Sequence, residues 1–265
     1  MMTPDLRIWG GPPYRVALVH GGPGAPGSMG PVARRLSARR GILEPLQTAD
    51  SLDGQVDELR KVLQRAGTLP ISVVGHSWGA ILGLVFSARY SSLVKKLILV
   101  GSAPLDKRHE QGTRNADRIQ RLPVEQRAEA SSLLEIIDSK AGPERDAAWR
   151  RLGPLLTKAD AYDPVTLDTE ELEIQAALNE RVWATAKPLR DSGELIELAR
   201  SIRCPVVAIH GDSDPHPVAG IREPLTTAID EFHFVLLDRC GHVPWIERDA
   251  AEPFFAVLEQ EFADV

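Results

Sequence analysis

Apolar and polar positions alternate along the first hundred residues between short buried runs and amphipathic stretches. Residues 14–20 read Tyr-Arg-Val-Ala-Leu-Val-His, an apolar run bounded by Gly and Pro that suits a strand buried on both faces. From Ser51 to Arg65 the apolar residues recur at helical spacing, with Asp50 or Ser51 as a possible cap and Gly67 as a possible end. The pattern then predicts a strand over 71–75, a helix over 77–90 and a strand over 96–100.

The last third of the chain returns to the same alternation. Short apolar runs at 206–210 and 232–237 predict two further strands, and residues 250–262 predict an amphipathic helix that packs on the sheet. Strands that alternate with helices imply a mostly parallel sheet with helices on both faces. The sequence therefore predicts the α/β class.

The middle of the chain breaks this alternation. Between Ala103 and Gly193 there are charged helical stretches and several prolines but no convincing strand. We therefore expect an inserted helical lid over residues 104–193, on a core formed by residues 1–103 and 194–265.

Composition and charge narrow the choice of partners. The chain has 265 residues, 43% of them hydrophobic, which is enough for one domain with a full core. Its 31 basic and 37 acidic residues give a net charge of −6 with no basic patch, so nucleic acid is not an expected partner. The first ten residues carry Asp5 and Arg7 and no apolar core, so we expect no signal peptide, no membrane partner and a cytoplasmic protein. A monomer or a homodimer is expected.

Residues 75–79 read Gly-His-Ser-Trp-Gly, which matches the pattern Gly-x-Ser-x-Gly. The motif lies between a predicted strand and a predicted apolar helix, where a sharp turn exposes the serine and leaves no room for side chains at the glycines. The helix N-terminus adds amide donors for developing negative charge. We predict that Ser77 is a nucleophile; the alternative is a glycine-bracketed turn without chemistry.

Together with residues 20–24, His-Gly-Gly-Pro-Gly, this motif resembles the α/β-hydrolase superfamily, in particular its proline iminopeptidase branch. The resemblance covers residues 6–102 and 200–263 and implies an α/β-hydrolase fold without a cofactor. It also implies an oxyanion hole made by the main-chain N–H groups of Gly22 and Trp78. His20 is expected to be a structural hydrogen-bonding residue.

The superfamily's chain order of serine, acid and histidine implies an acid after the next-to-last strand and a histidine after the last one. Asp214 lies in the loop Gly-Asp-Ser-Asp-Pro after residues 206–210, and His242 ends the run Cys-Gly-His. By this resemblance His242 takes the proton of Ser77, and Asp214 fixes the tautomer of His242.

Other roles for these polar residues remain open. Asp212 and Asp106 are alternative positions for the acid, and Asp212 would otherwise brace the turn. A metal site built from His210, Asp212, Asp214 and His216 is conceivable, but loop polarity explains this cluster and no metal is expected. Cys204 and Cys240 lack metal-ligand spacing and are interpreted as structural thiols.

A serine nucleophile implies an acyl-enzyme intermediate and cleavage of an ester or amide bond in a small molecule. Trp245 and Trp183 are the candidate substrate-binding residues, with Trp149 and Tyr162 as further aromatic candidates. In the peptidase branch lid carboxylates hold a free amine, for which Glu170, Glu171, Glu173 and Glu180 are candidates by residue type.

The sequence departs from the peptidase pattern at two places. Residues 41–51 lack the Asp-x-x-Gly-x-Gly turn of that branch. One of its usual N-terminal strands is also missing, because residues 6–9 are the only candidate strand before the first central strand. Ester hydrolysis and an aminopeptidase-like activity therefore both stay open. A hydrolase-fold ligand receptor without turnover and an inactive scaffold are the alternatives from other functional classes.

Overall fold

The computed structural model describes residues 5–110, 115–140, 142–165 and 175–263. In this part of the chain seven strands form one sheet in the order β1-β3-β2-β4-β5-β6-β7. Every neighbouring pair is parallel except β1, which runs antiparallel to β3. The strands are β1 (Leu6–Trp9), β2 (Tyr14–Val19), β3 (Gly41–Pro45), β4 (Ile71–His76), β5 (Val94–Val100), β6 (Val206–Gly211) and β7 (Phe232–Leu237).

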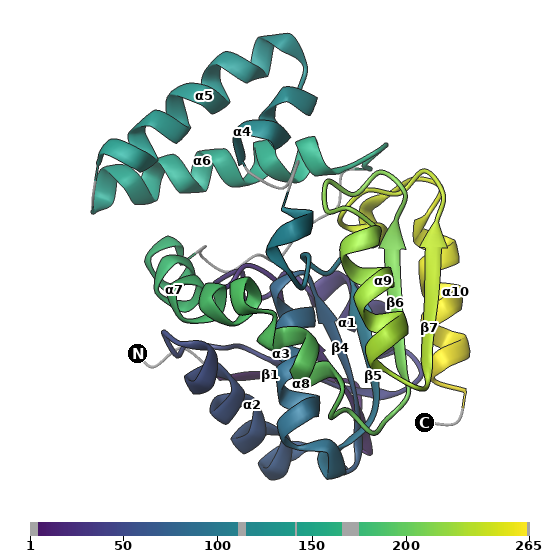
Figure 1. The fold of residues 1–265 in the computed structure, drawn as a ribbon. Coiled ribbons are helices and arrows are strands. Elements are labelled where there is room, and N and C mark those ends of the chain that lie inside the picture. The colour runs from purple at the N-terminus through teal and green to yellow at the C-terminus, as the bar shows by residue number, and fades with distance from the viewer. Residues whose placement is uncertain (1–4, 111–114, 141, 166–174, 264–265) are drawn as a thin grey trace.

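Helices cover both faces of this sheet (Figure 1). Helices α2, α3, α8 and α9 bury their apolar side chains against one face, and α1 and α10 bury theirs against the other. The helices are α1 (Gly30–Leu36), α2 (Leu52–Ala66), α3 (Trp78–Arg89), α4 (Asn115–Arg118), α5 (Val124–Ser139), α6 (Pro143–Asp160), α7 (Ala176–Ser192), α8 (Glu194–Ala199), α9 (Ala219–Ala228) and α10 (Ala251–Glu261).

The five strands and three helices predicted from periodicity are confirmed, with ends that shift by two residues at most. The sequence pattern did not predict β3. Its residues read Gly-Ile-Leu-Glu-Pro, a run without alternation or β-branched enrichment, yet all five are buried between β1 and β2. Glu44 is fully buried there, and Trp9 Nε1 donates to its carboxylate at 3.0 Å.

Helices α4 to α7 lie between β5 and β6 in the chain, and α4, α5 and α6 stand beyond the carboxyl ends of the strands (Figure 1). Helices α5 and α6 pack on each other around a hydrophobic cluster of their own, which is separate from the two clusters on the sheet. Among the described residues of this insertion the only β-type pairing is an isolated bridge between Pro164 and Glu247. No helix in the described part of the chain is both long and apolar enough to cross a membrane.

Candidate active site

Ser77 lies at the sharp turn between β4 and α3. Its φ of 55° and ψ of −114° are unusual for a residue with a side chain. The two flanking glycines make this turn possible, because a Cβ at Gly75 would overlap the carbonyl of Gly79 and a Cβ at Gly79 would overlap the carbonyl of Val19. Main-chain packing thus explains why Gly-x-Ser-x-Gly has glycine at both ends.

A continuous hydrogen-bonded chain connects Ser77, His242 and Asp214. Ser77 Oγ lies 3.0 Å from His242 Nε2, and His242 Nδ1 lies 2.9 Å from Asp214 Oδ2. Ser77 follows β4, Asp214 follows β6 and His242 follows β7, so the three side chains meet at the carboxyl edge of the sheet. The carboxylate of Asp214 is fully buried, whereas Ser77 is half-buried and therefore partly accessible to solvent.

Opposing effects determine whether His242 and Asp214 are charged. Burial disfavours the charged imidazolium, but the charge of Asp214 and the hydrogen bond to it outweigh burial and raise the pKa of His242 above its ordinary value. Burial likewise favours neutral Asp214, but its interactions with His242 and His216 hold the pKa of Asp214 well below the usual range. At neutral pH Asp214 is therefore an ionised acceptor that faces the histidine.

The glycine-rich loop after β2 lies directly against Ser77. A Cβ at Gly21 would come within 3.2 Å of the Cβ of Ser77, and Gly22 is exposed with φ of +116°. Trp78 is the first residue of α3, a position whose N–H has no partner within the helix. Trp78 directly follows Ser77, and Gly22 follows the loop residue that lies against Ser77; the role of their N–H groups in an oxyanion hole stays a prediction.

His20, beside this loop, has a structural role. Its Nδ1 donates to Gly21 O at 2.9 Å, and its Nε2 accepts from Gln47 N at 3.3 Å. Full burial lowers the pKa of His20 to about 4, so the ring is neutral. This arrangement agrees with the structural role expected from the sequence.

Two of the candidate pocket tryptophans have different surroundings. Trp183, on α7, is half-buried and packs edge-to-face on Trp78 with ring centroids 5.1 Å apart. Trp245 is buried in the core between the rings of His76 and Phe254, at 4.7 Å and 5.8 Å. Trp245 is 5% exposed, and its role in substrate binding stays a prediction.

The other aromatic candidates lie farther along the insertion. Trp149 packs on the cluster between α5 and α6, and Tyr162 is 52% exposed. Glu180 pairs with Arg145 at the surface. The other three candidate carboxylates, Glu170, Glu171 and Glu173, lie outside the described residues.

The end of helix α6 is bound to the loop that carries His242. Asp160 O accepts from His242 N at 2.9 Å, and the Asp160 carboxylate pairs with Arg118. The fully buried carboxylate of Glu247 accepts three main-chain bonds, from Gly241 at 2.8 Å, Tyr162 at 2.8 Å and Asp163 at 2.7 Å. The insertion and the histidine loop therefore share one hydrogen-bond network.

Residues 16–257 match the profile of the alpha/beta hydrolase family. The chain belongs to the alpha/beta hydrolase family. This membership confirms the resemblance read from the two glycine motifs and the α/β-hydrolase fold that it implied. No curated protein matches the sequence.

Solved structures agree with this membership. A putative lipase from Acinetobacter baumannii AYE has a TM-score of 0.65 at 18% identity, covering 100% of this chain and 91% of the lipase. A meta-cleavage product hydrolase from Pseudomonas fluorescens has a TM-score of 0.64 at 20% identity, covering 98% and 93%. Proline iminopeptidase from Mycobacterium smegmatis has a TM-score of 0.63 at 18% identity, covering 98% and 94%. At these identities the likeness concerns the fold.

In this alpha/beta hydrolase the three carboxylates considered as partners of His242 have different hydrogen-bond partners. Asp212 Oδ1 accepts from Cys240 N at 3.1 Å and from Ser213 Oγ at 3.0 Å, so it braces the turn. Asp106 pairs with Arg108 and His109 at the start of a short helical turn. Only Asp214 of the three lies within hydrogen-bond distance of His242.

Asp214, His216 and His242 form a group with the residue types of a metal site. However, both imidazoles turn Nδ1 toward the carboxylate, at 2.8 Å from His216 and 2.9 Å from His242. An ionised carboxylate only accepts, so both Nδ1 atoms carry protons and offer no lone pair to a metal. His210 donates to the main-chain oxygen of His216, and Asp212 faces Cys240, so neither adds a ligand.

The two cysteines are buried and free in this alpha/beta hydrolase. Burial raises the pKa of the Cys204 thiol to about 11 and also raises that of Cys240. A protonated buried thiol is a poor nucleophile. Both thiols are therefore structural, as expected.

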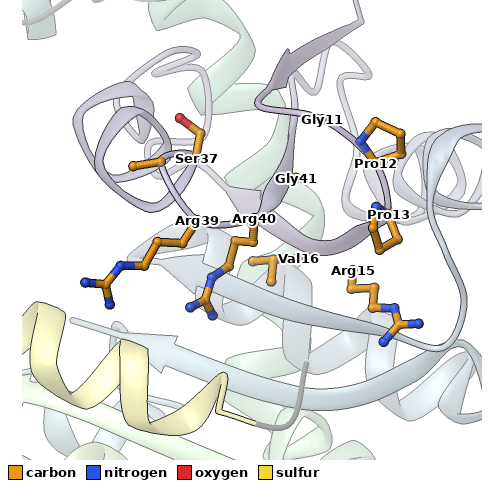
Figure 2. A pocket seen from close by; sticks show the side chains of 10 residues that line it. Gly11, Pro12, Pro13, Arg15, Val16, Ser37, Arg39, Arg40 and Gly41 are labelled. Atoms are coloured by element: carbon orange, nitrogen blue, oxygen red, sulfur yellow. The ribbon is translucent and has the colours of Figure 1, made fainter.

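A cavity of about 430 Å³ lies at the opposite edge of the sheet (Figure 2). It is lined by residues before and at the start of β2 and by residues from the end of α1 to the start of β3, including the side chains of Arg15, Arg39 and Arg40. Arg40 pairs with Glu259 of α10. The cavity lies at the amino ends of β2 and β3, whereas Ser77 and Asp214 follow the carboxyl ends of β4 and β6. It is therefore remote from the hydrogen-bonded chain of Ser77, His242 and Asp214.

Sequence reasoning missed several residues around His242. The sequence suggests His216 only as a possible metal ligand. It gives no indication that Arg118, Asp160 and Glu247 lie near His242. Arg118 and Asp160 belong to the insertion, where helical spacing carries no signal of contact with the core. The position of His216 two residues after Asp214 was a usable signal, because short loops let side chains bond to a neighbouring carboxylate.

Proposed function

We propose that this alpha/beta hydrolase is a serine hydrolase that cleaves an ester or amide bond of a small molecule through an acyl-enzyme intermediate. The observation that carries the proposal is the hydrogen-bonded chain from Ser77 Oγ through His242 to Asp214 Oδ2, with links of 3.0 Å and 2.9 Å. A nucleophile, a base and an orienting carboxylate at these distances have the geometry required for covalent catalysis by serine.

In the first step Ser77 Oγ attacks the substrate carbonyl while its proton passes to His242 Nε2. The resulting imidazolium is stabilised by ionised Asp214, whose oxygen faces Nδ1. His242 then gives the proton to the leaving alcohol or amine, which departs and leaves the acyl group on Ser77. A water molecule, deprotonated by His242, releases the acid and restores the serine.

The negative oxygen of the tetrahedral intermediate would be bound by the main-chain N–H groups of Gly22 and Trp78. This role is supported by the exposure of Gly22 beside Ser77 and by the position of Trp78 at the start of α3. The helix N-terminus adds a favourable dipole for the same charge.

We assign the insertion, residues 104–193, as a lid over the site, on a core of residues 1–103 and 194–265. Support comes from helices α4 to α6, which stand beyond the strand ends where Ser77 and His242 lie (Figure 1). Trp183 is the candidate wall for an apolar acyl group, because it is half-buried beside Trp78.

One of the four candidate carboxylates for an aminopeptidase-like activity is already paired. The candidate Glu180 already pairs with Arg145, so it is not a free carboxylate for a substrate amine. Aminopeptidase activity remains the alternative to be tested beside esters.

The proposal is tested by turnover of p-nitrophenyl esters of increasing acyl length, with prolyl and alanyl p-nitroanilides in parallel. Hydrolysis of at least one ester that Ser77→Ala abolishes is the expected result. Tight binding of such compounds by the folded protein without any turnover would overturn the proposal and favour a receptor.

A further inference from the structure

A second histidine faces Asp214 through the carboxylate oxygen that His242 does not use. His216 Nδ1 lies 2.8 Å from Asp214 Oδ1, and the main-chain N of His216 lies 2.9 Å from the same oxygen. The ring centroids of His216 and His242 are 4.7 Å apart. Asp214 therefore accepts hydrogen bonds from two imidazoles and one main-chain amide.

The charge state of His216 follows from its surroundings. Burial lowers the pKa of His216, and this effect outweighs the attraction of Asp214. The ring is therefore neutral at neutral pH. Its single proton lies on Nδ1, because the ionised carboxylate that it faces can only accept.

The main chain around His216 is fixed by a third histidine. His210, at the end of β6, is 1% exposed, and its Nε2 donates to His216 O at 2.9 Å. The other titratable and charged groups that act on His216 are Asp214 in its own loop, His242 after β7 and Arg118 of α4. His76, at the end of β4, is coupled to His216 and is neutral, because burial lowers the pKa of His76 to about 3.

We propose that His216 is a positioning residue that acts on His242 through Asp214. Its Nδ1–H fixes one carboxylate oxygen, so that the other stays directed at His242 Nδ1, and it takes up part of the carboxylate charge. The proposal rests on the proposed function, because it assigns His216 to the same hydrogen-bonded chain.

Removal of this donor has two expected effects. More of the charge of Asp214 then acts on His242, so the pKa of His242 rises further. The carboxylate is also held by one donor fewer, so acylation of Ser77 slows by roughly tenfold. The main-chain amide of residue 216 is retained in any variant, and the loss is therefore partial.

A matched pair of variants separates this role from packing. In His216→Asn the amide nitrogen takes the place of Nδ1 and can still donate to Asp214 Oδ1. In His216→Leu the volume is better conserved but the donor is gone. A packing role predicts that the Leu variant is closer to wild type, whereas the proposal predicts that the Asn variant is closer.

The experiment is a ¹⁵N-histidine NMR titration of the full chain, combined with the rate at which a fluorophosphonate labels Ser77. In the wild type we expect the His216 ring in the neutral form protonated on Nδ1. We expect a raised pKa of His242 and slower labelling in His216→Leu, with His216→Asn closer to wild type in both. A His216 ring protonated on Nε2, or a pKa of His242 that is unchanged in His216→Leu, would overturn the proposal.

The NMR measurement needs no turnover and therefore separates two failures. A wild-type protein that never labels at Ser77 would refute the proposed hydrolase activity. The tautomer of His216 and the pKa of His242 would still decide whether His216 acts through Asp214. The tautomer is read from the wild type, so this result does not depend on whether the variants fold.

Discussion

At the scale of single residues, the surroundings of each histidine determine its charge. His242 faces the ionised carboxylate of Asp214, and its pKa is raised in spite of burial. His20 and His76 are buried without a facing carboxylate within hydrogen-bond distance, and burial lowers their pKa values to about 4 and about 3. Only His242 among these three is poised to accept and release a proton near neutral pH.

The raised pKa of His242 predicts the acid limb of the pH–rate profile. A general base must be neutral in the free enzyme, so kcat/KM falls as the pH drops through the pKa of His242. Because Asp214 raises that pKa, we expect the midpoint above the ordinary histidine value of 6.5. The profile is measured with a p-nitrophenyl ester; a midpoint well below this value would contradict the assigned base.

The lowered pKa of His20 predicts a loss of stability in acid. The unfolded chain binds a proton at His20 below pH 6.5, whereas the folded chain binds it only near pH 4. Stability due to His20 is therefore complete above 6.5 and is lost between these values, by up to about 1.4 kcal/mol per pH unit.

Urea denaturation of His20→Gln at several pH values measures this contribution. We expect a flatter dependence of the unfolding free energy on pH between 6.5 and 4 than in wild type. His233→Gln, at an exposed histidine, is the matched control and should leave the slope unchanged. Equal slopes in His20→Gln and wild type would show that His20 titrates normally.

Residue types in the right order were enough to predict Ser77, Asp214 and His242 as candidates. The resemblance favoured Asp214 but left Asp212 and Asp106 as alternatives, because the position of the acid depends on how the loop after β6 turns. His216 illustrates the same limit, since its bond to Asp214 Oδ1 is a matter of side-chain direction.

At the scale of elements, close packing between main-chain segments explains why certain positions are glycine, which local propensity does not explain. A Cβ at Gly241 would overlap the carbonyl of Asp160 at the end of α6 and would come within 2.7 Å of Glu247 Oε1. A Cβ at Gly211 would overlap the carbonyl of Cys240. The loops after β6 and β7 thus need glycine so that other main-chain segments can approach them.

The network around Glu247 predicts a coupled loss of stability and activity. Glu247→Ala leaves the buried N–H group of Gly241 and the partly buried N–H groups of Tyr162 and Asp163 without their acceptor. We expect a loss on the order of 3 kcal/mol in unfolding free energy and a fall in kcat, because the loop carrying His242 is released.

Glu252→Ala is the matched control, since Glu252 is 76% exposed and pairs only with Arg35 at the surface. Thermal unfolding and ester turnover are measured for both variants. A Glu247→Ala protein as stable and as active as Glu252→Ala would contradict the network.

Helices α2, α3 and α10 and five of the parallel strands could be predicted because buried parallel strands and amphipathic helices leave clear periodicity. The short helices α1, α8 and α9 were not predicted. Strand β3 could not, since its burial comes from its neighbours β1 and β2 rather than from its own composition. The contact of α6 with the loop before His242 is a long-range contact and left no local signal.

At the scale of the whole molecule, the described residues form two hydrophobic clusters around the sheet and a third in the insertion. The third cluster is made by α5, α6 and the short turn before α5, and includes the fully buried Leu152. Helix α7, by contrast, contributes Leu178 and Val182 to a cluster on the sheet. The insertion is therefore stabilised partly by itself and partly by the core.

The separate cluster in the insertion predicts how far the effect of a core substitution on local stability extends. Leu152→Ala should cost about 2–5 kcal/mol of local stability and speed amide hydrogen exchange in α5 and α6, with little change in β4 and β5. Leu84→Ala, at a fully buried position of α3, should speed exchange throughout the sheet. Equal acceleration of β4 and β5 in both variants would show a single cooperative unit.

We propose Ser77 as an activated nucleophile, and intact-mass analysis after exposure to a fluorophosphonate tests this role. Peptide mapping locates any adduct, and folded Ser77→Ala serves as the control. We expect one adduct, on Ser77, that is absent from Ser77→Ala. An unlabelled wild-type protein that is shown to be folded, or an adduct that persists in Ser77→Ala, would contradict it.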